Sequence, residues 1–225
     1  MARLQISRIL LGALATTLQN AVRLAQALAI PAVLFLILSM IETDPENPNG
    51  PVVAITMILT IVLHTVVAVT THRITILGPD SIPTWGLNRW TIRETRFLVC
   101  LLSLGFGAAS LLIVSFALPQ PFGAAIAMLI AIVLGSAFSL IFPAVALEHE
   151  MTFAETWQLA KGNLFPLMVC VWLFPITLSV PIALLASIPY TTAIIVLLQM
   201  AANALTIAAL SLAYMELKRP PSTQE

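Results

Sequence analysis

The feature that most constrains this chain is a series of six long apolar segments. A helix needs about 20 predominantly apolar residues to cross the hydrocarbon core of a membrane. Each segment is close to that length, and polar connections separate them. The segments span residues 24–41, 52–71, 97–117, 122–143, 164–187 and 192–214. The sequence therefore predicts an all-α, polytopic membrane protein with six transmembrane helices.

The composition indicates that lipid is the surrounding medium. Hydrophobic residues make up 60% of the 225 residues and charged residues only 9%, whereas charged residues make up about 25% of a typical soluble domain. So few charges cannot cover the surface of a protein in water. We therefore expect residues 1–225 to form a single integral membrane domain.

The ten lysines and arginines are placed very unevenly along the chain. They precede the first span, separate the second from the third, precede the fifth and follow the sixth. The three alternate connections, residues 42–50, 119–121 and 188–191, contain none. Because basic connections stay on the cytoplasmic side of a membrane, both termini are predicted to be cytoplasmic.

An amphipathic segment precedes each odd-numbered span, at residues 3–22, 85–96 and 152–162. The third begins with Thr152-Phe-Ala-Glu155, a pattern typical of a capping box at a helix start. We expect these segments to lie in the membrane interface and the six spans to form three helical hairpins. For the first segment, a cleaved signal peptide is the weaker alternative.

The second and third interfacial segments carry candidates for binding lipid headgroups or a protein partner. Arginine at the cytoplasmic surface attracts anionic lipid by about 1 kcal/mol, and tryptophan prefers the headgroup level. The candidates are Arg89, Trp90, Arg93, Arg96, Trp157 and Lys161. The three arginines recur at i, i+4 and i+7 and form an arginine stripe. Simple anchoring of the topology is the ordinary role of such residues, and a specific lipid or partner site is the sharper hypothesis.

Polar side chains inside the spans form a second group of candidates, since such residues often mark function. Thr56, Thr60 and His64 recur at i+4 spacing on the second span, and Asn203 lies in the sixth. We expect the face with His64 to look into the bundle. His64 is interpreted as a neutral histidine bonded to a threonine or a carbonyl, and proton relay or ligand binding is the alternative. No charged residue lies at mid-membrane, which disfavours an ion-coupled transporter.

Small residues at i+4 spacing occur in three spans and predict close helix packing. Tight packing within one bundle is the expected use, and a homo-oligomer face is the alternative. The residues are Ser103, Gly105, Gly107 and Ala109 in the third span, Ala127, Ala131, Gly135 and Ser139 in the fourth, and Ala204 and Ala208 in the sixth.

No catalytic or metal-binding motif is present in the sequence. The nucleophile elbow, the H-E-x-x-H motif and the phosphate-binding P-loop are all missing. Glu148, His149 and Glu150, with His72, are a weak metal candidate because three consecutive residues cannot all face one ion from a helix. We therefore expect no catalytic, cofactor or metal site, and no nucleic-acid partner.

Two stretches are similar to a known family. Residues 147–163 resemble a pattern in which an acidic residue follows a proline-ended helix and precedes a helix that enters the next span. Glu148, Ala154, Trp157 and Lys161-Gly162-Asn163 carry this similarity.

His72-Arg73 with Leu77-Gly78 resembles a W-H-R-x-x-L-L-G-E run of proteobacterial membrane proteins, although Thr70-Thr71 replaces the usual tryptophan and Pro79 the usual glutamate. Together the stretches resemble the superfamily of the glycerophosphodiester phosphodiesterase membrane domain. The resemblance implies a six-helix protein of the bacterial inner membrane. In that superfamily hydrolysis belongs to a separate soluble domain, so the resemblance does not imply phosphodiesterase activity.

These observations favour a non-enzymatic protein that acts by binding. The leading hypothesis is an accessory, assembly or scaffold subunit of a larger membrane complex, with anionic lipid and a membrane protein as its partners. The alternative is a small oligomeric transporter or lipid-handling protein that uses the polar face of the second span.

Overall fold

The computed structural model describes residues 3–41, 49–85, 89–119, 121–188 and 190–219. Within these ranges all regular structure is helical, and six helical stretches are long and apolar enough to cross a membrane. These stretches are Ala21–Ser39, Gly50–Leu77, Ile92–Ser115, Phe122–Ala146, Leu164–Ser187 and Thr192–Lys218. The predicted all-α class with six candidate spans is confirmed.

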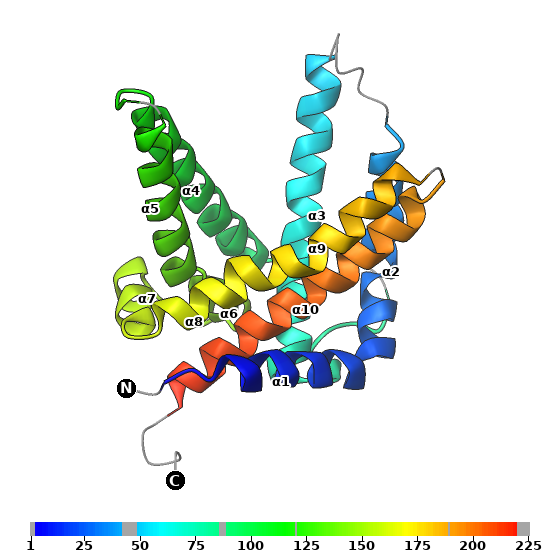
Figure 1. The fold of residues 1–225 in the computed structure, drawn as a ribbon. Helices are drawn as coiled ribbons and strands as arrows, with labels where there is room; N and C mark the ends of the chain where they lie inside the picture. Colours follow the sequence, from blue (N-terminus) through cyan, green and yellow to red (C-terminus); the bar gives the residue numbers. More distant parts are fainter. Residues whose placement is uncertain (1–2, 42–48, 86–88, 120, 189, 220–225) are drawn as a thin grey trace.

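The described helices follow one another along the chain with few long connections (Figure 1). They are α1 (Ile6–Gln19), α2 (Ala21–Ser39), α3 (Gly50–Leu77), α4 (Ile92–Ser115), α5 (Phe122–Phe138), α6 (Ile141–Ala146), α7 (Phe153–Ala160), α8 (Leu164–Met168), α9 (Phe174–Leu184) and α10 (Thr192–Lys218). Short 3₁₀ turns span Pro79–Ser81 and Leu185–Ser187, and a π-helical turn spans Val169–Leu173.

Prolines explain why the fifth span is broken into pieces. Helix α9 begins directly after the π-helical turn that ends at Leu173, and Pro175 is its second residue. Proline has no N–H to donate and its ring clashes with the carbonyl four residues earlier. A π-helical turn before it removes that conflict locally.

Helix α10 lies at the centre of the fold. It contacts α1 along its C-terminal half, and it also packs against α2, α3 and α9. Ala209, Ala213 and Tyr214 of α10 are almost completely buried together with Ile9 and Ala13 of α1. Helix α1 therefore runs across the lower end of the molecule as drawn in Figure 1.

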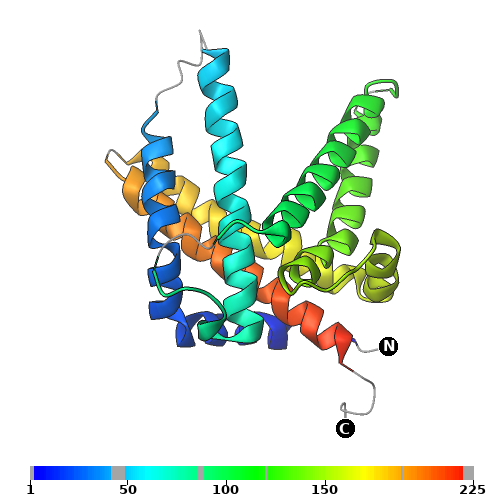
Figure 2. The same ribbon diagram turned by 180° about the vertical axis from the view of Figure 1, so that it is seen from behind.

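Helices α4 and α5 form an arm that leans away from the other spans (Figures 1 and 2). They pack against each other, and near their lower ends they contact α3, α6, α7 and α8. We refer to α4 and α5 as the α4–α5 arm. Beyond Cys100, the least exposed positions of α4 recur every three or four residues, which is the spacing of a single packing stripe. They are Leu101, Leu104, Ala108, Leu111 and Ser115, and Phe97 lies on the same stripe nearer the helix start.

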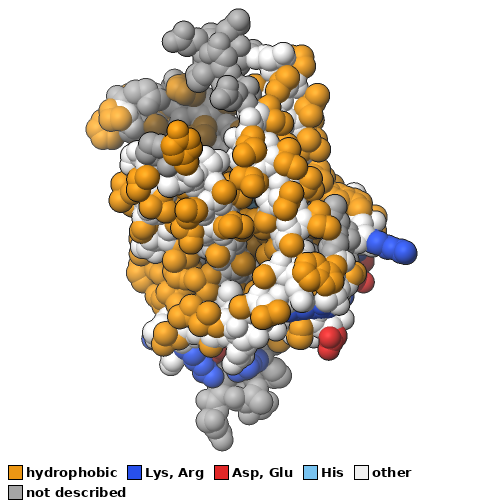
Figure 3. Space-filling view, turned by 90° about the vertical axis from the view of Figure 1, so that its right-hand side faces the viewer, with side chains coloured by type: hydrophobic (Ala, Val, Ile, Leu, Met, Phe, Trp, Pro, Cys, Tyr) orange, Lys and Arg blue, Asp and Glu red, His pale blue; other side chains and the backbone are white. Residues whose placement is uncertain are grey.

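Charged side chains gather toward one end of the molecule, and apolar side chains cover most of the rest of the face in Figure 3. Large exposed hydrophobic residues include Phe106 of α4 and Phe122 of α5, both 71% exposed. A surface of this kind is expected where lipid, rather than water, surrounds the spans.

Candidate functional site

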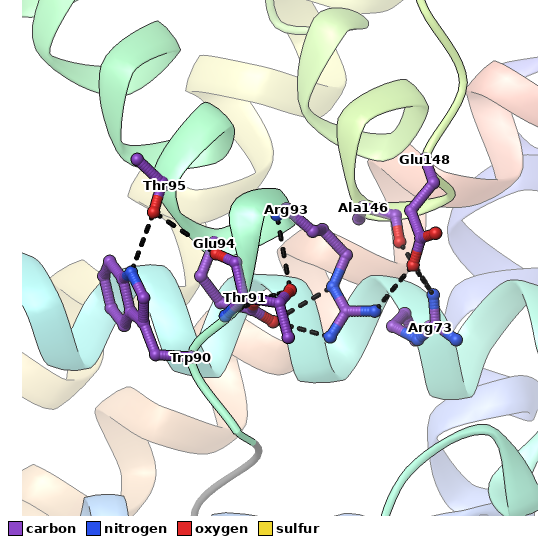
Figure 4. Close-up of polar contacts among 8 residues, drawn as sticks. All are labelled: Arg73, Trp90, Thr91, Arg93, Glu94, Thr95, Ala146 and Glu148. Carbon is purple, nitrogen blue, oxygen red and sulfur yellow. Dashed lines mark hydrogen bonds and ion pairs between the residues drawn. The ribbon is translucent and has the colours of Figure 1, made fainter.

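Two arginines and two glutamates meet where α3, α4 and the α6–α7 connection come together (Figure 4). The Arg93 guanidinium donates to Glu94 Oε1 through Nε at 3.0 Å and Nη2 at 2.6 Å. Its Nη1 donates to Glu148 Oε1 at 2.9 Å. Arg73 Nη1 lies 3.5 Å from the same glutamate oxygen and donates to the Ala146 carbonyl at 3.2 Å. We refer to Arg73, Arg93, Glu94 and Glu148 as the arginine junction.

A capping box positions the two junction residues of α4. Thr91 is the N-cap, and its hydroxyl accepts a hydrogen bond from the Arg93 backbone N–H at 3.3 Å. The Thr91 N–H and hydroxyl both donate to Glu94 Oε2, so both oxygens of this carboxylate have partners. Glu94 is 1% exposed, and a charge so deeply buried requires such partners.

Glu148 contacts both arginines of the arginine junction, and its backbone has an unusual conformation. Its φ of 62° lies in the left-handed region, which costs a residue other than glycine of order 1 kcal/mol or more. Two backbone hydrogen bonds at the end of α6 hold this conformation, from the Glu148 N–H to the Val145 carbonyl at 3.0 Å and from the His149 N–H to the Ala144 carbonyl at 2.9 Å. Since the junction balances two positive and two negative side chains, it fastens the base of the α4–α5 arm to α3 and α6.

The other members of the predicted arginine stripe do not join the junction. Arg89 and Trp90 precede α4 and are exposed; the Trp90 indole donates to Thr95 Oγ1 at 2.9 Å. Arg96 is exposed and lies 3.8 Å from Glu150. The i, i+4, i+7 spacing does not produce one basic face because the helix starts only at Ile92.

Helix α7 begins with the predicted capping box. Thr152 accepts from the Glu155 N–H at 3.2 Å, and its own N–H and hydroxyl donate to Glu155 Oε2 at 2.7 and 3.0 Å. These two donated hydrogen bonds, the backbone one first, hold the pKa of Glu155 below its ordinary value. Trp157 packs toward Phe138 of α5, with ring centroids 6.3 Å apart, while Lys161 is exposed.

The groups considered for a metal site have other partners. His72 Nδ1 lies 2.7 Å from Ser211 Oγ, and His149 Nδ1 lies 3.2 Å from the Tyr214 hydroxyl. Glu148 belongs to the arginine junction. Across the described part of the chain, no three His, Cys, Asp or Glu side chains are arranged to hold a metal ion.

A second group of polar residues surrounds a cavity of about 300 Å³ between α2, α3 and α10. The cavity brings together all four intramembrane candidates, Thr56, Thr60, His64 and Asn203. Gln199 of α10, which the sequence analysis missed, completes the set. Its position four residues before Asn203 was the available signal, because residues at this spacing share a helix face. We refer to these five residues as the polar pocket.

Hydrogen bonds order part of the polar pocket. His64 Nδ1 lies 2.9 Å from the Thr60 carbonyl, and the His64 ring meets Phe35 of α2 edge to face at a centroid distance of 4.8 Å. Gln199 Nε2 donates to Ser179 Oγ at 3.2 Å and to Asn203 Oδ1 at 3.4 Å. The predicted histidine–carbonyl contact is confirmed, whereas the expectation that His64 looks into the bundle is wrong, because its side chain is exposed.

The small residues predicted to pack helices behave differently in different spans. Gly135 of α5 lies against Trp172, whose ring is 3.1 Å from where a β-carbon would stand. The Trp172 indole also donates to the Ile132 carbonyl at 3.2 Å and to Ser136 Oγ at 3.1 Å. By contrast, Gly105 and Gly107 of α4 face open space: apart from their chain neighbours and the helix's own backbone, no atom of the described residues lies within 4 Å of an added β-carbon.

Comparison with known proteins gives no relative: no protein-family model, curated protein or solved structure matches this chain. The resemblance to the glycerophosphodiester phosphodiesterase membrane domain therefore stays a hypothesis.

Proposed function

We propose that this protein is a non-catalytic accessory, assembly or scaffold subunit whose α4–α5 arm binds a transmembrane helix of another protein in a larger membrane complex. One observation carries the proposal. The small-residue faces of α5 and α10 are used inside the chain, whereas no described residue packs against Gly105 or Gly107 of α4.

The physical argument concerns how helices associate in lipid. Lipid tails are as apolar as leucine, so association depends on close packing of backbones at small residues. Gly105 with Ala109 lets a neighbouring backbone approach one side of α4 closely, and Gly107 with Ser103 does so on the opposite side, because residues four apart share a helix face and residues two apart do not. The arginine junction fastens the base of the arm, so the arm is ordered before a partner arrives and less entropy is lost on binding.

The setting of this subunit is part of the same proposal. The gathering of charge toward one end (Figure 3) supports a chain with both termini on the cytoplasmic side of a bacterial inner membrane. Contacts of α2 with α3, α4 with α5 and α9 with α10 support three hairpins. In this arrangement α1, the segment before α4 and α7 lie in the interface beside anionic lipid.

Site-specific photocrosslinking in the native membrane tests the docking face. A photoreactive amino acid replaces Phe106, which is 71% exposed on α4, or Ile176, which is 53% exposed on α9. We expect the probe at position 106 to join one distinct protein and the matched probe at position 176 to join none. No protein adduct at 106, or the same adducts at both positions, would contradict the proposal.

The polar pocket favours one alternative, a small oligomeric transporter or lipid-handling protein. Its five polar side chains surround a cavity near the C-terminal end of α2 and beside the N-terminal halves of α3 and α10, rather than packing against one another throughout. Under this alternative the face of α4 binds a second copy of the chain. The adduct at position 106 would then have twice the mass of this chain, which distinguishes the two functions.

A further inference from the structure

We propose that the polar pocket binds the head of a neutral amphiphile that carries a free hydroxyl group, of which diacylglycerol is the simplest example. The pocket lies among α2, α3 and α10, so the inference does not depend on what the α4–α5 arm binds. It gives the lipid-handling alternative a ligand class, and a failure to bind would leave the crosslinking result unaffected.

The charge of the ligand follows from the lining of the cavity. Besides the five polar-pocket residues, the lining among the described residues consists of Ser39 and apolar side chains, and none of these described residues is a lysine, arginine, aspartate or glutamate. A charged headgroup in such a place would lie in a low-dielectric environment without a counter-charge, which is very costly. The cavity therefore selects for an uncharged head.

The need for a hydroxyl group follows from the protonation of His64. Its Nδ1 lies 2.9 Å from the Thr60 carbonyl oxygen, and a carbonyl oxygen can only accept. Nδ1 therefore carries a proton, and in the tautomer with a single proton Nε2 is an acceptor. Among the described residues no donor pairs with this Nε2. A hydroxyl on the ligand supplies the missing donor.

Asn203 supplies the complementary group. Its Oδ1 accepts from Gln199 Nε2, which leaves the two N–H groups of its amide to donate. An ester carbonyl or an ether oxygen in the ligand is the matching acceptor. A head with one hydroxyl and one carbonyl, a few atoms apart, satisfies both His64 and Asn203.

An apolar cavity next to the polar pocket provides a binding surface for the acyl chains of the ligand. It measures about 490 Å³ and lies between α10 and the helices α1 and α2. Met200 lines both cavities, and among the described residues that line the second cavity Thr17 is the one with a polar side chain. Acyl chains that extend from the polar pocket past Met200 therefore pack against an apolar surface.

Native mass spectrometry of the detergent-solubilised full chain, titrated with dioleoylglycerol, tests the inference. We expect one molecule to bind saturably to each chain. The O-methyl ether of the same lipid, which has no hydroxyl donor, should bind about tenfold more weakly, the loss of one hydrogen bond of about 1.4 kcal/mol. Absence of saturable binding, or equal binding of the two lipids, would overturn the proposal without any mutation.

Variants then locate the site. His64→Leu and Asn203→Leu are each expected to weaken dioleoylglycerol binding about tenfold, by the same loss of one hydrogen bond. Thr177→Val is the matched control, because its hydroxyl is exposed on α9 and already donates to the Phe174 carbonyl. Wild-type affinity in both pocket variants would show that the lipid binds elsewhere and would refute the assignment.

Discussion

The fourth and third spans carry the same kind of sequence pattern and use it in opposite ways. In α5 the small face around Gly135 receives Trp172, whereas in α4 Gly105 and Gly107 are open. Within the most apolar stretch of each span, 33% of the residues are buried for Phe122–Ala146 and 6% for Ile92–Ser115. A small-residue pattern thus shows where a backbone can approach, but not whether the approaching helix belongs to the same chain.

The largest loss of stability is expected from a substitution where the α4–α5 arm meets the rest of the molecule. Arg93→Met removes the partner of Glu94, which is 1% exposed, and leaves a buried carboxylate without its counter-charge. Breaking a buried ion pair in this way costs about 3–5 kcal/mol. The free energy of unfolding in mixed micelles measures this loss.

Arg96→Met is the matched control for that experiment. Arg96 forms an exposed contact of 3.8 Å with Glu150, and such surface pairs contribute about 0–1 kcal/mol. Equal destabilisation by the two substitutions would contradict the view that the junction, rather than basic charge in general, holds the arm.

Placing leucine at a packed glycine and at an open glycine tests this comparison directly. Gly135→Leu forces a side chain into Trp172 and should destabilise the protein by about 1–3 kcal/mol, as overpacking does. Gly105→Leu should not lower the free energy of unfolding, because position 105 is open and leucine favours a helix interior over glycine by up to about 1 kcal/mol. Equivalent losses at both sites would show that α4 is packed within the chain after all.

The smallest effect concerns the cap of α7, which lies beneath α5. Thr152→Val removes one of the donors to Glu155 and should raise the pKa of Glu155 toward its ordinary value of 4.5. Because the folded-state pKa is lowered, the cap stabilises fully above the ordinary pKa and loses its contribution as pH falls through the folded-state value. NMR titration of carboxyl-labelled glutamate measures the pKa of Glu155, with Thr206→Val as the control. An unchanged pKa in Thr152→Val would show that the Thr152 hydroxyl does not lower it.

Much of the fold could be predicted because apolar length alone defines a span. The start of α4 was misplaced although the sequence contained its signal. Thr91-x-x-Glu94 is a capping box, and it sets the helix start after Arg89, so the three arginines cannot share a helix face. The pairing of Arg73 and Arg93 with Glu148 had no local signal, because it joins residues that only the tertiary fold brings together.

The candidate pocket was predictable in part. The i+4 spacing of Thr56, Thr60 and His64 indicated one face of α3, and the structure places that face beside Asn203. The sequence could not show which helix would face it. That choice depends on α10 lying at the centre of the fold, where it contacts α1, α2, α3 and α9.

Native mass spectrometry of the protein, extracted gently from its own membrane, tests the central claim most directly. The wild type is compared with the double variant Gly105→Leu, Gly107→Leu and with Ala183→Leu on the exposed surface of α9. We predict a stoichiometric protein partner on the wild type and on Ala183→Leu, and its loss from a double variant that still folds. A wild-type chain without a protein partner, or a double variant that keeps it, would contradict the account.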